Sequence, residues 1–216
     1  MKKKLDIIAT IKDGVALALV NYVSILATVV LYVVSIFIPY INVGTTIAIA
    51  SLPAEMAKGK VVNPIFIFDS KYRRNMGEFL ILEALKMGAL WVAYCFLLIP
   101  GMVIAMAWRY AEVLFVDKNK SPMEALRESN DITYGNKWRI FWIEFLLVLA
   151  LAVAVLIIIG LFSLGHVEWL ETIGSIIVAI LCIFVVPAMM GVEAVIYKRL
   201  TEPEAPEQKP EPEKEA

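Results

Sequence analysis

The chain has 216 residues, 60% of them hydrophobic, and its mean hydropathy is +0.76. A water-soluble domain of this length could not bury so much apolar surface, so the composition excludes that class and favours a membrane protein. The formal net charge of −1 conceals a separation of charge, because residues 201–216 carry six Glu against two Lys. The rest of the chain is therefore basic.

The first segment, residues 1–14, starts with Met-Lys-Lys-Lys and then becomes apolar. It resembles the start of a signal peptide, but the apolar run that follows is too long and has no small-x-small cleavage site. We therefore expect an amphipathic lead-in near the lipid headgroups, followed by an uncleaved first span.

Long apolar runs follow one another along the chain, and in lipid such runs must form helices because the backbone has no water to bond to. Five are expected in the membrane, at residues 15–38, 41–57, 77–99, 138–162 and 173–197, with a shorter amphipathic sixth at residues 102–116. The sequence thus predicts an all-α, polytopic membrane helix bundle. About six membrane helices would form three hairpins.

Two of these crossings are short. Residues 41–57 and 102–116 would extend roughly 22–26 Å as helices, less than the hydrocarbon core of about 30 Å. Either they span while sheltered inside the bundle, or they are re-entrant or surface helices. The second alternative would place the basic residues that follow position 57 outside the cell, so six crossings are preferred.

The basic residues fix the expected orientation. They cluster at residues 2–4 and 12, 58–74, 118–139 and 198–199, whereas the turns at 39–40, 100–101 and 163–170 contain no Lys or Arg. By the positive-inside rule the clusters face the cytoplasm. We therefore expect a multi-pass protein of the cytoplasmic membrane with both termini inside.

Between the spans, two polar segments carry helix-start signals. Asn63-Pro64 has the chemistry of a cap and first turn. The run from Ser121 to Glu124 is a capping box, opening a helix that should end at Gly135. Its inner face is expected at Ala125, Ser129 and Ile132, with Glu124, Arg127, Glu128 and Asp131 turned mainly to water. Residues 15–200 would form the bundle domain, and residues 201–216 a disordered acidic tail.

Ionisable residues inside the predicted spans are the sharpest functional signal, because charge in lipid is costly. This polar layer comprises Glu55, Glu83, Lys86, Arg109, Glu112, Glu144 and Glu193. It could line a polar cavity or ion path, or it could consist of interfacial anchors and internal ion pairs, which is the preferred interpretation. In a hairpin that turns at Pro100, Lys86 and Glu112 reach similar depth and should pair. Arg109 could stack over Trp91.

No catalytic, metal or cofactor motif is recognisable. His166 has one neighbouring acid, too few ligands for zinc, and Cys95 and Cys182 lie in apolar surroundings that predict packing. The basic clusters predict contact with membrane lipids, anionic headgroups included, and no nucleic acid. The residues expected at headgroups are Lys58, Lys60, Lys71, Arg73, Arg74, Lys137, Arg139, Lys198 and Arg199.

One stretch of the chain resembles a known family. The residues are Pro100-Gly101, Arg109-Tyr110, Glu124-Ala125 with Ser129, and Gly135 with Trp138. Their order is similar to that in a broad bacterial family of multi-spanning proteins, which includes the membrane domain attached to some glycerophosphodiester phosphodiesterases. The resemblance covers roughly residues 60–200 and implies a six-helix membrane domain. The catalytic domain of those enzymes is absent from this sequence.

The expected function follows from these observations. The chain is predicted to be a non-enzymatic membrane scaffold or accessory subunit that binds protein partners or forms a homo-oligomer. The alternative is a small-solute transporter or lipid-handling protein that uses the polar layer. A water-accessible cavity ringed by Glu would favour transport, and a packed set of ion pairs would favour scaffolding.

Overall fold

The computed structural model describes residues 4–163 and 168–202, and within these ranges the chain is helical, without a strand. The helices in chain order are α1 (Ile7–Val20), α2 (Tyr22–Ser35), α3 (Pro39–Ala50), α4 (Leu52–Ala57), the 3-10 turn η1 (Pro64–Phe68), α5 (Lys71–Arg74), α6 (Met76–Phe96), α7 (Leu98–Ala107), α8 (Ala111–Asp117), α9 (Pro122–Thr133), α10 (Lys137–Ser163) and α11 (Glu168–Thr201). The predicted all-α class is confirmed.

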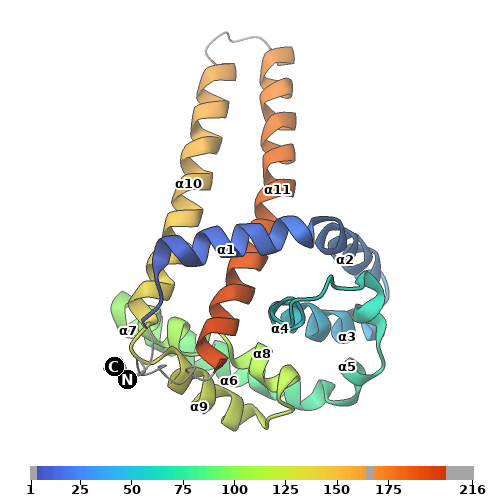
Figure 1. Ribbon diagram of the computed structural model, residues 1–216, viewed down its shortest axis with the longest axis vertical. Coiled ribbons are helices and arrows are strands. Elements are labelled where there is room, and N and C mark those ends of the chain that lie inside the picture. Colours follow the sequence, from blue (N-terminus) through green and yellow to red (C-terminus); the bar gives the residue numbers. More distant parts are fainter. Residues whose placement is uncertain (1–3, 164–167, 203–216) are drawn as a thin grey trace, which may run out of the picture.

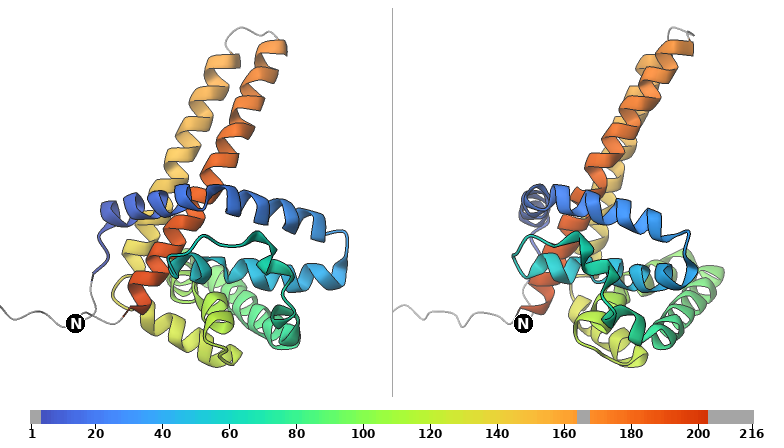
Figure 2. Two further views of the ribbon diagram at one scale, coloured as in Figure 1. Left: turned by 45° about the vertical axis from the view of Figure 1, so that its right-hand side comes forward. Right: turned by 90° about the vertical axis from the view of Figure 1, so that its right-hand side faces the viewer.

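A long hairpin of α10 and α11 dominates the shape. Figure 1 shows it projecting beyond the remaining helices, and both views of Figure 2 show it standing clear of them. With 27 residues, α10 is about 40 Å long at 1.5 Å per residue, enough to cross a bilayer. The predicted spans 138–162 and 173–197 correspond to these two helices.

Four helical segments in the described part of the chain are long and apolar enough to cross a membrane. They are Met76–Phe96, Leu98–Asp117, Lys137–Ser163 and Trp169–Thr201, and the number rises to five if the bent pair α1 and α2 counts as one span. The protein therefore has the helices of a multi-pass membrane protein. The predicted arrangement of six crossings in three hairpins is not confirmed.

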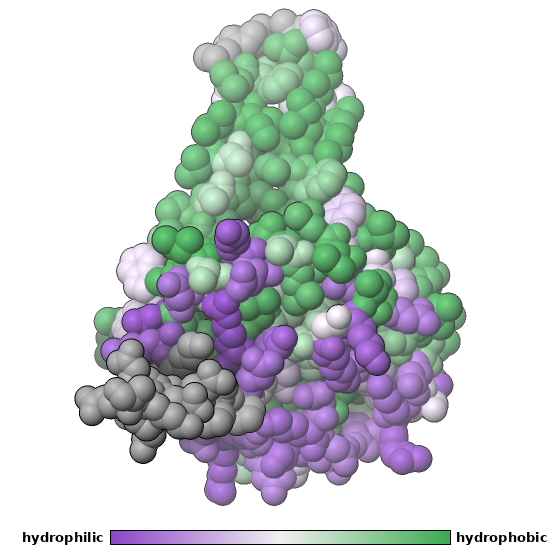
Figure 3. All heavy atoms as spheres, viewed as in Figure 1, coloured by the Kyte–Doolittle hydropathy of each residue, from purple (hydrophilic) through white to green (hydrophobic). Residues whose placement is uncertain are grey.

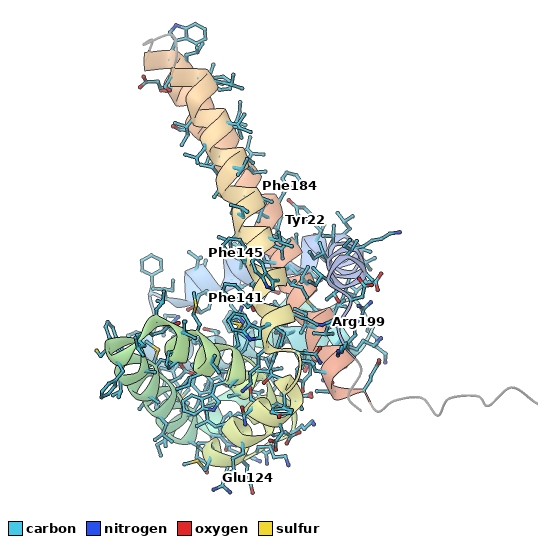
Figure 4. The ribbon with its side chains drawn as sticks, turned by 90° about the vertical axis from the view of Figure 1, so that its left-hand side faces the viewer. Tyr22, Glu124, Phe141, Phe145, Phe184 and Arg199 are labelled. Carbon is cyan, nitrogen blue, oxygen red and sulfur yellow. The ribbon has the colours of Figure 1, made fainter. Side chains whose placement is uncertain are left out.

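The first predicted span, residues 15–38, is broken at Asn21. Helices α1 and α2 meet there at 73°. Asn21 is buried, and its side chain accepts a hydrogen bond from the Val62 amide at 3.0 Å while donating to the Leu17 carbonyl at 3.1 Å. Tyr22, the next residue, stacks on Phe184 of α11 with ring centroids 5.2 Å apart (Figure 4). These contacts stabilise a bend in a run whose hydropathy is continuous.

The predicted short crossing at residues 41–57 is also divided. Helix α3 has 12 residues, or about 18 Å of helix, which is too short to cross a bilayer. Ser51 follows it and donates to the Ala48 carbonyl at 2.7 Å, and Pro53 lies at the start of α4. Proline suits a first helical turn because it lacks an amide hydrogen, so a new helix begins here.

The predicted turn at Pro100 lies slightly earlier in the chain. Helix α6 ends at Phe96, Leu97 is extended with φ −162° and ψ 144°, and Pro100 falls in the first turn of α7. The predicted spans 77–99 and 102–116 still correspond to α6 and to the segment formed by α7 and α8. Helix α7 thus begins two residues before Pro100, and the proline does not form the turn itself.

Helix α1 crosses α11 where the hairpin joins the rest of the molecule (Figure 1). Small residues meet at this crossing. A Cβ built on Gly14 would lie 2.5 Å from the Val192 Cα, and one built on Gly191 would lie 2.7 Å from the Ala18 Cβ. Glycine and alanine four residues apart allow such close approach of membrane helices.

The polar end of the molecule lies opposite the hairpin tip. Figure 3 shows hydrophobic side chains over the hairpin and hydrophilic ones gathered at the other end, where Figure 4 places Glu124 of α9. The capping box predicted at Ser121 and Glu124 is formed, and Gly135, with φ +83°, follows the helix as predicted. Of the predicted inner face, Ala125 and Ser129 are fully buried.

The two described chain ends lie together at the base of the hairpin. The Leu5 amide donates to Asn136, just before α10, at 2.9 Å, and Arg199 near the end of α11 donates to Thr10 of α1 at 2.7 Å. The start of the described chain and the end of α11 therefore lie side by side. Most of the predicted acidic tail lies outside the described residues.

Candidate functional site

The seven residues of the predicted polar layer do not share one cavity. The structure divides them among three clusters of ion pairs, which we name after their central residues. The Lys86 cluster contains Glu83 and Glu112, and the Arg109 cluster contains Glu144 and Glu193. The Glu55 cluster contains Glu55 with Lys58 and Lys71, two residues outside the predicted layer.

A break between α7 and α8 positions Arg109. The break leaves backbone groups without helical partners, and Ser129 of α9 satisfies two of them. Its hydroxyl donates to the Ala107 carbonyl at 2.8 Å and accepts from the Tyr110 amide at 3.1 Å. The serine predicted on the inner face of α9 therefore holds the loop that carries the arginine.

Arg109 joins this loop to both helices of the hairpin. Its Nε donates to Glu144 of α10 at 2.8 Å, and a terminal guanidinium nitrogen contacts Glu193 of α11. Arginine suits this role because its planar fork can bind two carboxylates at once. The guanidinium thus faces the two glutamates, whereas the sequence predicts that it stacks over Trp91. Trp91 is 69% exposed.

The predicted pair of Lys86 and Glu112 is formed. The Lys86 ammonium contacts the Glu112 carboxylate across the α6–α8 contact and lies 2.9 Å from Glu83 on its own helix. The lysine side chain is 15% exposed, and each carboxylate is about 30% exposed. This cluster therefore lies on the inner side of α6, partly shielded from the surroundings.

The third cluster lines a polar pocket of about 230 Å³ between α4, α5 and α8. Glu55 forms ion pairs with Lys58 at 2.9 Å and with Lys71 at 3.8 Å, and Lys58 lies 4.0 Å from Asp117 on the facing helix. The remaining lining residues include Ser51, Tyr72, Asn75, Asn119 and the apolar Ile47, Ala54, Phe115 and Val116. Sequence inspection missed Asp117 and the two asparagines, because they lie outside the predicted layer.

A second, apolar pocket of about 200 Å³ lies where α7 meets the start of α10. Its lining includes Met102, Met106, Tyr134, Trp138 and Phe141, with Lys137 among them. Lys137 itself donates to Asn130 at 2.7 Å. The pocket has the composition of a lipid-facing groove at a membrane interface, where Trp, Tyr and Lys are common.

Several residues predicted to contact headgroups instead bind protein groups. Arg73 donates to the Phe68 carbonyl at 3.0 Å, Arg139 contacts the Leu5 carbonyl, and Arg199 contacts Asp13 as well as Thr10. Lys198 lies 3.6 Å from Glu202. Lys60 and Arg74, in contrast, are exposed. Several of the basic residues therefore stabilise the fold.

Within the described residues, no group of three or more His, Cys, Asp or Glu is placed to hold a metal ion. Cys95 and Cys182 are free thiols and exposed, so the predicted packing role is wrong for the isolated chain, although both lie on helices that can face lipid. His166 lies outside the described residues.

Comparison with protein families, with curated proteins and with solved structures found no match to this chain. The resemblance to the multi-spanning bacterial family therefore stays a prediction.

Proposed function

We propose that this chain is a non-enzymatic protein of the cytoplasmic membrane that acts as a scaffold or accessory subunit, binding protein partners or further copies of itself. On this proposal the α10–α11 hairpin anchors the molecule in the bilayer. The basic, polar end, with α9 and the segment between α4 and α6, faces the cytoplasm and carries the binding surface.

The proposal rests on one observation: the charged residues within the candidate spans are paired with one another. A path for a polar solute requires ionisable groups that share a water-accessible cavity and exchange partners. Here Lys86 and Arg109 each bind two carboxylates at contact distance, on separate sets of helices. Such pairs fix the helices relative to one another, which is the property a rigid scaffold needs.

The outer face of α9 supports the location of the binding surface. Arg127 and Asp131 are exposed on α9, and Met123 of the same helix is 50% exposed. The opposite face of α9 is buried against the core. A well-packed helix with exposed charged and apolar side chains resembles the mixed composition of protein interfaces.

A transport or lipid-handling function is the second candidate, and one observation favours it. The Lys86 and Arg109 clusters each hold one cation and two carboxylates, so each carries one unbalanced negative charge when fully ionised. In a medium of low polarity such a site favours uptake of a proton or cation. The Tyr110 hydroxyl next to the Arg109 cluster is also buried and lacks a hydrogen-bond partner within the described part of the chain.

Two measurements on the full chain separate these functions. Crosslinking in native membranes followed by purification should capture a stoichiometric partner, or a second copy, and Arg127→Glu on α9 should abolish capture. Lys12→Glu changes an exposed residue of α1, outside this surface, and is the control. Proton or solute flux in proteoliposomes that is lost on Glu144→Gln, without a captured partner, would contradict the scaffold proposal and favour transport.

A further inference from the structure

The polar pocket lies at the level where two candidate spans end. Asn75 directly precedes α6 and Asn119 follows α8, and the Asn75 amide donates to the Asn119 side-chain oxygen at 3.2 Å. Both residues line the pocket. Because Met76–Phe96 and Leu98–Asp117 are candidate spans, the pocket opens at their polar ends, where lipid headgroups lie.

The lining of the pocket contains charges of both signs. Lys58, Lys71 and Glu55 come from the side formed by α4 and α5, and Asp117 comes from α8. Two ammonium groups and two carboxylates make the lining neutral in sum, so it offers no net attraction to a simple anion or cation. A ligand with one charge of each sign would match it.

The two lysines are available to a ligand. Lys58 and Lys71 have side chains 52% and 56% exposed, and both form ion pairs with Glu55. The Lys71 ammonium also lies 4.7 Å from the centre of the Tyr72 ring, which holds it over the pocket wall. Partial burial opposes the charge on Lys71, but Tyr72, Glu55 and Asp69 together raise the pKa of its ammonium.

A hydrogen bond from Tyr197 of α11 holds Asp117 in place. Its carboxylate accepts a hydrogen bond from the Tyr197 hydroxyl of α11 at 2.7 Å, while the other oxygen lies 4.0 Å from Lys58. A carboxylate has about four acceptor positions, so one hydrogen bond leaves capacity for a further donor. The pocket lining also contains the Ser51 and Tyr72 hydroxyls, which lie 3.3 Å apart.

We propose that this pocket binds a zwitterion that carries a phosphate and a primary ammonium group, the chemistry of phosphoethanolamine. Lys58 and Lys71 hold the phosphate, and Asp117 with Glu55 holds the ammonium. The cavity of about 230 Å³ admits a headgroup and not a whole lipid, whose chains would remain in the bilayer. The inference does not depend on the proposed scaffold function.

Calorimetric titration of the purified full chain in detergent tests this binding with phosphoethanolamine, inorganic phosphate and ethanolamine as separate probes. Phosphoethanolamine should bind at least tenfold more tightly than either half alone. Lys71→Gln should weaken its binding about tenfold, the effect of losing one charged hydrogen bond. Lys12→Gln removes the same charge from an exposed position on α1 outside the pocket and should change nothing.

The role of Asp117 is tested by comparing how its substitution changes the binding of phosphoethanolamine and of phosphate. Asp117→Asn should weaken phosphoethanolamine binding and leave phosphate binding equal or stronger, because it removes a negative charge. Where the loss of the Tyr197 contact unfolds that variant, Glu55→Gln replaces it. Equal affinity for phosphate and phosphoethanolamine, no saturable binding, or an effect of Lys12→Gln equal to that of Lys71→Gln would overturn the proposal.

Nanodiscs distinguish the two sources of the ligand. Selective retention of phosphatidylethanolamine over phosphatidylcholine, lost in Lys71→Gln, identifies a lipid headgroup. Binding of free phosphoethanolamine without lipid selectivity identifies a soluble zwitterion, which is the same chemistry from another source.

Discussion

Gly14 of α1 and Gly191 of α11 lie so close that a Cβ built on Gly191 would stand 2.3 Å from the Gly14 carbonyl oxygen. The crossing therefore has no room for a side chain at either position. It brings the first helix of the chain across the base of the hairpin, with Arg199 and Thr10 bonded beside it at 2.7 Å.

Gly191→Ala should lower the thermal stability of the detergent-solubilised protein, because the added methyl group must push two backbones apart. We expect a loss of about 1–3 kcal/mol, the usual effect of overpacking a tight site. Gly88→Ala in α6 is the matched control, since its added methyl would meet nothing within 4 Å. Equal melting temperatures for the two variants would contradict this account of the crossing.

Asn21→Leu should also destabilise the protein. The leucine cannot accept the Val62 amide, so a buried donor loses its partner, at a cost of about 1–3 kcal/mol. The loop that contains Lys58 and Lys60 should become more susceptible to trypsin. Val20→Leu, at a neighbouring position that is 67% exposed, should leave both thermal stability and proteolysis unchanged. Faster cleavage in that control would show that the effect is not specific to Asn21.

These two sites show what the sequence could and could not predict. Hydropathy identified α10, α11 and the α6–α8 segment, because long apolar runs have one stable form in lipid. The bend at Asn21 was missed because a single polar residue hardly changes a window average, and its partner Val62 lies 41 positions away. The contact of small residues at the α1–α11 crossing could not be predicted either, since the local sequence does not indicate which glycine packs against another helix. Cap signals, which are local, were predicted correctly at Asn63 and Ser121.

Clusters of charge were predicted only in part, for a related reason. Lys86 and Glu112 could be paired because they lie on consecutive helices at similar distance from one turn. The partners of Arg109 come from α10 and α11, 35 and 84 positions away, and their packing against the α7–α8 break depends on the tertiary fold.

Orientation can be tested with single cysteines. After replacement of Cys95 and Cys182 by Ala, Lys60→Cys and His166→Cys should label from opposite sides with a membrane-impermeant thiol reagent. The expectation follows from the absence of Lys and Arg between residues 163 and 170. Labelling of both positions from one side would contradict the proposed cytoplasmic polar end.

The polar end should lose stability in acid through Glu128. Hydrogen bonding from Lys118, aided by Lys120, lowers the pKa of this carboxyl, although partial burial opposes the shift. Because the pKa in the folded state lies below that in the unfolded state, the contribution is present above the unfolded value. It is lost as the pH falls through the folded value. At neutral pH Glu128→Gln should cost about 0.2–1 kcal/mol, as for other exposed pairs. The melting temperatures of wild type and variant should converge in acid, and a constant difference would contradict the linkage.

The pair of Lys86 and Glu112 bears most directly on function. Lys86→Met leaves Glu112 without its cation or forces it to take up a proton, so stability should fall. The double variant Lys86→Met with Glu112→Leu should recover much of the loss, giving a coupling energy of about 0.5–3 kcal/mol in thermal unfolding. Exposure of the two side chains at 15% and 29% places the expected value toward the lower end.

The same variants separate scaffold from transporter. If the cluster fixes helices, the stability losses are coupled and the wild type shows no flux in proteoliposomes. If it binds a transported proton or cation, each single variant keeps its stability and changes the flux. Additive stability losses would refute the pairing itself, since two residues that stabilise each other cannot lose their contributions independently.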